Sequence, residues 1–219
     1  MKREEIVYAT KSEFKRQEIA AICDVIKFRD RDGSERLVGE HFQFRFSEVK
    51  TDEPLEVDLE RMVRHKAVSA YKALLMPCIV EHAGIILQKH IEQGFPGGLT
   101  QPMMDALGAE GFIHRTNSAG EPAIARAVIG YCDGTSVRVF RGETVGVIVA
   151  EPRGAREFYW DTIFAPDSFE GRTYAEVTAT GEAGIRKKMT VSQSAIAMRL
   201  FLEHRARSGF GELFVDFGG

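Results

Sequence analysis

The chain alternates between short apolar runs and longer segments of helical periodicity, and this alternation most constrains its fold. Ile6–Ala9 is a short apolar run that ends at Thr10. The next segment places Phe14, Ile19, Ile22 and Val25 at helical spacing, which predicts a helix with these residues facing inward. A strand, a tight turn and a helix follow one another, and such a turn offers free backbone N–H groups to phosphate.

Similar patterns continue along the first half of the chain. Asp32-Gly33 predicts a hairpin turn. Apolar residues alternate over residues 36–49, as in strands, and a helix is expected from Pro54 with one apolar face between Leu59 and Leu74. The remaining expectations here are a buried strand at Pro77–Val80, a loop at Gly94–Gly98, and a short helix Gln101–Leu107 capped by Thr100.

The second half predicts a three-stranded meander and a closing helix. The expected strands are Ile124–Cys132, Val137–Phe140 and Val145–Val149, with turns at Asp133-Gly134 and Gly142. A helix over residues 192–205 would bury Ile196, Leu200 and Phe201. The whole pattern predicts an α/β fold: one unit with a long mixed sheet and a second lobe.

Composition narrows the class of protein. With 219 residues and 44% hydrophobic content, the chain can build a substantial core. A net charge of −3 gives no sign of a surface for nucleic acid or acidic membranes. No signal peptide or membrane span is visible, and the three cysteines are widely spaced, so we expect a reducing, cytoplasmic location.

The segment Pro152–Asp161 is rich in charged and aromatic side chains, and it contains the only Trp of the chain. Its aromatic faces could stack on a planar base, while Asp161 could accept hydrogen bonds from N–H groups of that base. Arg153 and Arg156 could meet phosphates. The competing interpretation is that the aromatic residues belong to the core, since such clusters more often do.

Several motifs, in order, resemble those of the inosine triphosphatase family of non-canonical purine nucleoside triphosphate pyrophosphatases. The strongest block joins Pro152-Arg-Gly, Phe158-Tyr-Trp-Asp161 and Thr173-Tyr-Ala-Glu176, with Tyr159 where the family has Gly and Thr162 where it has Pro. The resemblance covers roughly residues 6–205. It implies a single domain over residues 1–219, with a strongly twisted mixed sheet flanked by helices, two lobes, a central cleft and a hairpin insertion near residues 28–42.

Residues Ala9–Glu18 resemble the family's opening motif, which holds phosphates. By this resemblance Thr10, Ser12 and Lys15 bind the triphosphate, with Ser12 in place of the family's Asn. A strand end that leads into a helix suits an anion, because free N–H groups and the helix dipole both favour it. The alternative is an ordinary capped helix with surface lysines.

The segment Val80-Glu81-His82-Ala83-Gly84 falls where the family has two adjacent acids. The resemblance implies that Glu81 binds Mg²⁺, with Mn²⁺ as another option, and that an acid among Glu48, Asp52 and Glu53 completes the metal site; Glu53 is our choice. His82 stands where the family has its proposed general base. An imidazole can act as a base near neutral pH, but it is a poor ligand for Mg²⁺. His82 therefore indicates a substituted base, a changed reaction, or a protein that binds nucleotide and barely hydrolyses it.

The part of the implied site that would hold the purine base, called the base end below, also departs from the family. By resemblance Phe158 and Trp160 line the base, Asp161 faces its edge, and Lys188 and Ser192 match family positions. Gln193 and Ser194 replace the His-Arg pair that contributes to reading a 6-oxopurine. Ser194 loses a cation and up to five donors relative to Arg, so base preference is expected to differ.

The resemblance implies a metal-dependent nucleoside triphosphate pyrophosphatase, with Glu81 and His82 as catalytic residues and a homodimer as the assembly. The alternatives are a nucleotide-binding module with weak or no hydrolysis, and a hydrolase of a different phosphorylated nucleoside.

Overall fold

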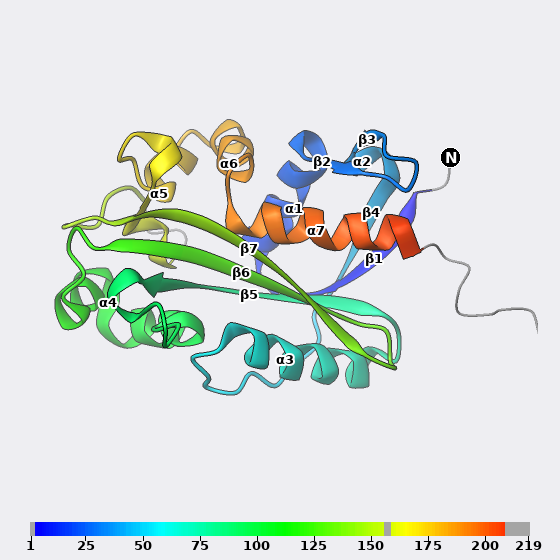
Figure 1. The fold of residues 1–219 in the computed structure, drawn as a ribbon, viewed down its shortest axis with the longest axis horizontal. Coiled ribbons are helices and arrows are strands. Elements are labelled where there is room, and N and C mark those ends of the chain that lie inside the picture. Colours follow the sequence, from blue (N-terminus) through cyan, green and yellow to red (C-terminus); the bar gives the residue numbers. More distant parts are fainter. Residues whose placement is uncertain (1–2, 156–158, 209–219) are drawn as a thin grey trace, which may run out of the picture.

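A six-stranded mixed sheet runs through the molecule, with helices on both of its faces (Figure 1). The computed structural model describes residues 3–155 and 159–208. The strand order is β4-β1-β5-β6-β7-β8, parallel from β4 to β5 and antiparallel from β5 to β8. The strands are β1 Glu4–Ala9, β4 Phe42–Ser47, β5 Cys78–Leu87, β6 Pro122–Cys132, β7 Val137–Ile148 and β8 Phe164–Pro166. The α/β prediction with a twisted mixed sheet is confirmed.

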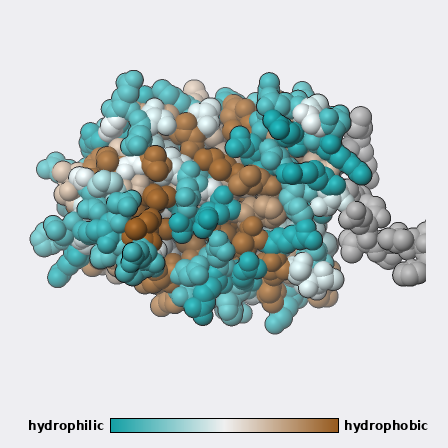
Figure 2. Space-filling model, viewed as in Figure 1, coloured by the Kyte–Doolittle hydropathy of each residue, from teal (hydrophilic) through white to brown (hydrophobic). Residues whose placement is uncertain are grey.

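Seven α-helices lie in the described part of the chain. They are α1 Glu13–Val25, α2 Val38–His41, α3 Leu59–Leu74, α4 Thr100–Thr116, α5 Tyr174–Thr178, α6 Glu182–Met189 and α7 Gln193–Ser208. In Figure 1, α1, α6 and α7 lie above the long strands, and α3 lies below them. Figure 2 shows hydrophilic residues over most of this face, with hydrophobic residues in patches between them. Among the described residues, no helix has both the length and the hydropathy to cross a bilayer.

Residues 27–47 form a hairpin, a short helix and a strand. The Asp32-Gly33 turn joins β2 Lys27–Arg29 to β3 Glu35–Leu37, which pair antiparallel as a separate two-stranded sheet. The strand predicted across residues 36–49 is broken by α2, which buries Val38 before β4 begins. The hairpin is therefore present, while its being an insertion relative to the family stays a prediction.

Three predicted boundaries differ from the structure because of local contacts. The helix expected from Pro54 begins at Leu59, since the Asp58 carboxylate accepts hydrogen bonds from the backbone of Glu60 and Arg61. The strand expected at Pro77–Val80 extends to Leu87. Thr100 does not cap its helix: its Oγ1 accepts from Ile85 N at 2.9 Å and donates to Gly97 O at 2.7 Å.

The meander contains two long strands rather than three shorter ones. Gly142 lies inside β7, paired with Ala127, so the predicted turn there is wrong. A Cβ at Gly142 would come within 2.0 Å of Gln193 O, which means that this glycine lets the first turn of α7 lie against the strand. The closing helix buries Met198, Phe201 and Leu202, whereas Leu200 is 38% exposed.

Residues on alternate sides of β5 pack into different parts of the core. Ile79 and Ala83 join the cluster that contains Ile19, Ile22 and Phe201 from α1 and α7. Val80 joins the cluster that contains Val63 and Ala67 from α3. Because side chains alternate along a strand, Glu81 faces the α1 and α7 side and His82 faces the α3 side.

Candidate active site

A turn between β1 and α1 brings the predicted phosphate-binding residues to one end of the sheet. Ser12 caps α1, and its Oγ accepts from Lys15 N at 3.3 Å. Thr10 Oγ1 accepts from Ser12 N at 3.1 Å. Thr10 and Ser12 therefore form the turn itself, and they place Lys15 in the first turn of the helix.

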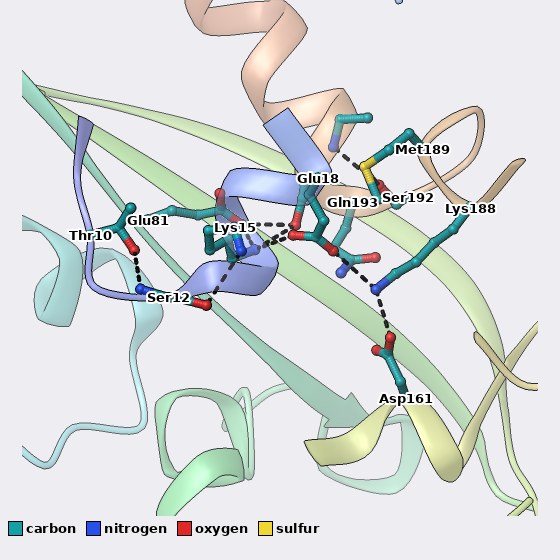
Figure 3. A network of polar contacts seen from close by, with 12 residues as sticks. Thr10, Ser12, Lys15, Glu18, Glu81, Asp161, Lys188, Met189, Ser192 and Gln193 are labelled. Carbon is teal, nitrogen blue, oxygen red and sulfur yellow. Dashed lines mark hydrogen bonds and ion pairs between the residues drawn. The ribbon is translucent and has the colours of Figure 1, made fainter. Parts of the chain in front are cut away.

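Lys15 points toward carboxylates (Figure 3). Its Nζ lies 2.6 Å from Glu81 Oε1 and 2.9 Å from Glu18 Oε2. Burial acts to lower the pKa of Lys15, but Glu18 and Glu81 outweigh it and raise the pKa above its ordinary value. Lys15 is thus a partly buried ammonium held between two carboxylates.

The chain of charges continues from Glu18 toward the base end. Glu18 Oε1 lies 3.0 Å from Lys188 Nζ, which lies 2.6 Å from Asp161 Oδ2. We call Glu81, Lys15, Glu18, Lys188 and Asp161 the ion network; Figure 3 shows its members converging from β5, α1, α6 and the segment that carries Asp161. It holds three carboxylates and two ammonium groups, all from residues predicted as site residues except Glu18.

The pKa values of two acids of the ion network, Glu18 and Asp161, shift in opposite directions. Burial acts to raise the pKa of Glu18, but Lys15 and Lys188 outweigh it and hold that pKa at about 2. For Asp161 burial dominates, and its pKa is raised despite Lys188. Asp161 Oδ1 is buried and has no hydrogen-bond partner within the described residues, so it can accept a hydrogen bond from a ligand.

A cleft of about 590 Å³ lies between α1, α5 and α6, beside these charges. Phe14, Glu18, Asp161 and Lys188 are among its lining residues. Its volume falls within the range of small-molecule pockets. The ion network therefore opens onto a space that a nucleoside-sized ligand can occupy.

The remaining residues of the predicted base end are mostly buried and structural. Trp160 is 2% exposed, and its ring meets Phe164 edge-on with centroids 5.9 Å apart, so it is a core side chain here. Ser192 Oγ accepts from Ala195 N in the first turn of α7. Gln193 Oε1 accepts from Tyr174 Oη at 3.1 Å. Phe158 lies outside the described residues.

The Pro-Arg-Gly and Thr-Tyr-Ala-Glu motifs hold each other together. Thr173 and Glu176 form a reciprocal capping box at the start of α5. Thr173 Oγ1 also donates to Arg153 O at 3.0 Å, and a Cβ on Gly154 would lie 2.7 Å from Ala175. Arg153 donates to Gly171 O and lies 3.6 Å from Glu176, so it contacts protein groups rather than an open phosphate site.

Comparison with known proteins identifies the family. The model of the Ham1 family matches residues 6–204. The chain belongs to the Ham1 family. A dITP/XTP pyrophosphatase from Methanopyrus kandleri is 30% identical over 166 residues, covering 75% of this chain and 81% of the relative. An inosine triphosphate pyrophosphatase from Scheffersomyces stipitis is 31% identical over 175 residues, covering 78% and 86%.

Solved structures of Ham1 proteins share the fold. The Staphylococcus aureus Ham1 protein superposes with a TM-score of 0.58 at 19% identity, covering 92% of this chain and 99% of that one. A HAM1 protein from Coxiella burnetii gives a TM-score of 0.58 at 18% identity. The family resemblance drawn from the motifs is confirmed.

This Ham1 chain does not bring the predicted metal ligands together. Glu81 accepts from Tyr8 Oη, Lys15 Nζ and Ser194 Oγ at 2.6–2.8 Å, so both of its oxygens are engaged. Glu53 lies on the α3 side with Lys66 and His82. Within residues 3–155 and 159–208, no group of three or more His, Cys, Asp or Glu residues could hold a metal. The side chains in this arrangement do not fit a protein-built Mg²⁺ site, which needs oxygen ligands free to coordinate.

Sequence reasoning missed Tyr8 and Glu18 in this Ham1 site, and it placed Ser194 at the base end only. Tyr8 and Ser194 are tied to Glu81, and Glu18 joins the two lysines of the ion network. Glu18 follows Lys15 by three residues and ends the opening motif, so helical spacing was a usable signal. Tyr8 had none, because its contact depends on the pairing of β1 with β5.

Proposed function

We propose that this chain hydrolyses a nucleoside triphosphate carrying a non-canonical purine base, and releases the monophosphate and pyrophosphate. The observation that carries the proposal is the Ham1 match over residues 6–204, together with relatives of about 30% identity that are named dITP/XTP and inosine triphosphate pyrophosphatases. A cleft of nucleoside size beside the ion network supports it.

In this proposal the ends of the ion network have different tasks. Lys15 and Lys188 supply positive charge for phosphate oxygens, and an arriving phosphate would compete with Glu81, Glu18 and Asp161 for them. Asp161 Oδ1 accepts an N–H of the base. Trp160 supports this end from the core, and Phe158, Ser192 and Gln193 complete the proposed nucleotide contacts.

Metal dependence and a homodimer are also part of the proposal. Mg²⁺ commonly binds through substrate phosphates with few protein ligands, so it would enter with the triphosphate. We expect EDTA to abolish turnover, Mg²⁺ or Mn²⁺ to restore it, and light scattering to give twice the 24.5 kDa chain mass.

The test is product analysis with a panel of canonical and deaminated nucleoside triphosphates. We expect monophosphate and pyrophosphate, with dITP, ITP or XTP as the best substrates. Release of inorganic phosphate without pyrophosphate would contradict the proposal, since it requires cleavage of a different bond.

A second candidate is a nucleotide-binding module with little hydrolysis. It is favoured by His82 in place of an acid, with its Nε2 buried and unpartnered among the described residues. Measurable binding of the best nucleotide without turnover, and strong turnover in His82→Asp, would favour this candidate.

A further inference from the structure

Two of the three cysteines lie directly opposite each other in the sheet, although positions 78 and 132 are far apart in the chain. Cys78 begins β5, Cys132 ends β6, and the two residues are register partners on these antiparallel strands. Both side chains belong to the buried cluster on the α3 side, which also contains Val63 and Ala70. The third cysteine, Cys23, lies on α1 and packs against the cluster on the other face of the sheet.

Direct opposition on antiparallel strands fixes how close the two cysteines come. Residues paired in this way have Cα atoms about 4.5 or 5.5 Å apart, depending on whether they exchange backbone hydrogen bonds. A disulfide requires Cα atoms about 4.4–6.8 Å apart, so both kinds of pair lie within its range. Cys78 and Cys132 can therefore be joined without sliding one strand along the other.

The two sulfurs differ in how an oxidant can reach them. Cys78 is 1% exposed, and its burial raises the pKa of its thiol to about 12, with a further contribution from Cys132. Cys132 is 5% exposed and ends its strand next to the Asp133-Gly134 turn. Strand ends at turns open locally more readily than the middle of a core, so Cys132 is the sulfur that an oxidant meets first.

We propose that Cys78 and Cys132 form a redox-sensitive modification site, at which a peroxide joins the two thiols in a cross-strand disulfide and stabilises the fold. The site is independent of the proposed hydrolysis, because neither cysteine is among the residues that line the cleft or form the ion network. The competing interpretation is that both thiols serve only as small apolar side chains of the core, as buried cysteines commonly do.

Hydrogen peroxide is sufficient to balance the proposed reaction. The sulfur of Cys132 attacks one peroxide oxygen, the O–O bond breaks, and a sulfenic acid and water form. The sulfur of Cys78 then attacks the sulfenic sulfur, so that the S–S bond forms and the S–O bond breaks. The hydroxyl leaves as water with the proton of the Cys78 thiol. Two thiols are oxidised, the peroxide is reduced to water, and thiol–disulfide exchange with a small dithiol reverses the change.

The test is peroxide oxidation of the folded full chain, ended with catalase and followed by unfolding in an alkylating reagent and mass spectrometry of peptides. We expect a peptide pair joined through Cys78 and Cys132, with Cys23 alkylated, and recovery of both thiols after dithiothreitol. The joined fraction should not depend on protein concentration, since the bond forms within one chain. Absence of this bond under conditions that fully oxidise glutathione, or joining to Cys23 or to a second chain instead, would overturn the inference.

The urea-unfolded parent chain is a matched control that needs no variant. Cys23 and Cys78 are separated by nearly the same number of residues as Cys78 and Cys132, so closing either loop has nearly the same entropic cost in an unfolded chain. We expect oxidation in urea to give both pairings in similar amounts. Exclusive pairing of Cys78 with Cys132 in urea as well would show that the fold does not select the pair, against the inference.

Two variants check the assignment in the folded protein. Cys132→Ala should leave Cys78 as a thiol after the same treatment, because its register partner has lost the sulfur. Cys23→Ala should form the disulfide at the rate of the parent, because Cys23 lies on the other face of the sheet. Loss of the disulfide in Cys23→Ala would contradict the assignment.

Thermal unfolding measures the effect of the bond on stability. A cross-link restricts the unfolded chain, so the oxidised parent should unfold at a temperature roughly 4–16 °C above that of the reduced parent. Peroxide should give no such increase in Cys132→Ala, which controls for oxidation at other side chains. Equal unfolding temperatures for the oxidised and reduced parent would overturn the stabilising role. None of these measurements uses turnover, so failure of the proposed function would leave their outcome unchanged.

Discussion

Glu81 and His82 are neighbours on one strand, yet their surroundings differ in almost every respect. The Glu81 side chain is 2% exposed, and both of its oxygens are hydrogen-bonded to Tyr8, Lys15 or Ser194. His82 has one long contact, to Glu53, and one buried nitrogen with no partner among the described residues. The first side chain has its hydrogen-bonding capacity filled by the protein, and the second has capacity left for a ligand.

From this difference we expect Glu81 to contribute mainly to the stability of the fold and His82 mainly to function. A group whose partners all come from the protein contributes mainly to folding, whereas an unpaired group costs stability and persists where function uses it. Because the two side chains face opposite sides, a change at position 82 leaves the Glu81 contacts intact. Variants at each position should therefore move different observables.

The largest expected effect on stability comes from Glu81→Ala. It leaves the Tyr8 hydroxyl and Ser194 without their acceptor and removes one of the two carboxylates that pair with Lys15. Breaking a buried ion pair in this way costs roughly 3–5 kcal/mol. Urea unfolding measures the loss in the free energy of unfolding, with Glu60→Ala as the control. A loss below about 1 kcal/mol would mean that Glu81 contributes no more to stability than we expect for His82.

Acid should weaken the ion network next. Because the folded pKa of Glu18 is about 2 and its ordinary value is 4.5, its contribution is complete above pH 4.5 and is lost as the pH falls toward 2. One such group changes stability by at most about 1.4 kcal/mol per pH unit. Asp161 acts in the opposite sense, since its raised pKa makes the folded state bind that proton more tightly.

Urea unfolding between pH 2.5 and 7 checks this prediction in the parent and in Glu18→Gln. The parent should lose stability as the pH falls through this window, and the variant should show a shallower dependence. Equal slopes in the two proteins would mean that Glu18 does not carry the acid sensitivity.

A smaller effect is expected from Ser194→Ala. The variant removes a donor to Glu81 at 2.8 Å and an acceptor for Lys15 at 3.2 Å, but the direct Lys15–Glu81 pair remains. A loss of about 1.5 kcal/mol is typical of one hydrogen bond to a charged group. Thermal unfolding of Ser194→Ala beside Ser208→Ala, at the partly buried C-terminal end of α7, measures it; equal values would show that Ser194 adds nothing to the network.

The smallest change in stability should come from His82→Leu. It removes a buried nitrogen that has no partner in residues 3–155 and 159–208 and fills most of the same space, so the free energy of unfolding should stay within about 1 kcal/mol of the parent. Glu53 keeps Lys66 as a partner. Stability and turnover measured on the same sample sharpen the comparison with Glu81: retained folding with lost turnover is expected, and a large loss of stability would contradict it.

Much of the fold could be predicted because its signals are local. The strand before Thr10, the hairpin turn at Asp32-Gly33 and the helical face between Leu59 and Leu74 all follow from neighbouring residues. The order of the motifs then identified the family. Gly142 was misread because its role is a close approach to α7, and that contact joins residues 51 positions apart, 142 and 193.

The candidate site was less predictable for the same physical reason. Lys15, Lys188 and Asp161 were named as separate ligand contacts, but their pairing through Glu18 depends on how α1 packs against α6. The choice among Glu48, Asp52 and Glu53 was open in the sequence. The structure pairs Glu48 with Arg16 at 2.6 Å and places Glu53 beside His82.

The clamp between Arg153-Gly154 and Thr173–Glu176 has a consequence for how such chains are recognised. Its contacts are a helix cap, a hydrogen bond from Thr173 to a backbone oxygen and a close approach of Gly154 to Ala175, which lines the cleft; none of them involves the ion network or His82. A block of this kind can persist while the groups around a reacting bond are exchanged. Sequence searches based on this block will find proteins that share one fold. Their reactions must be distinguished by positions such as 53, 82, 193 and 194.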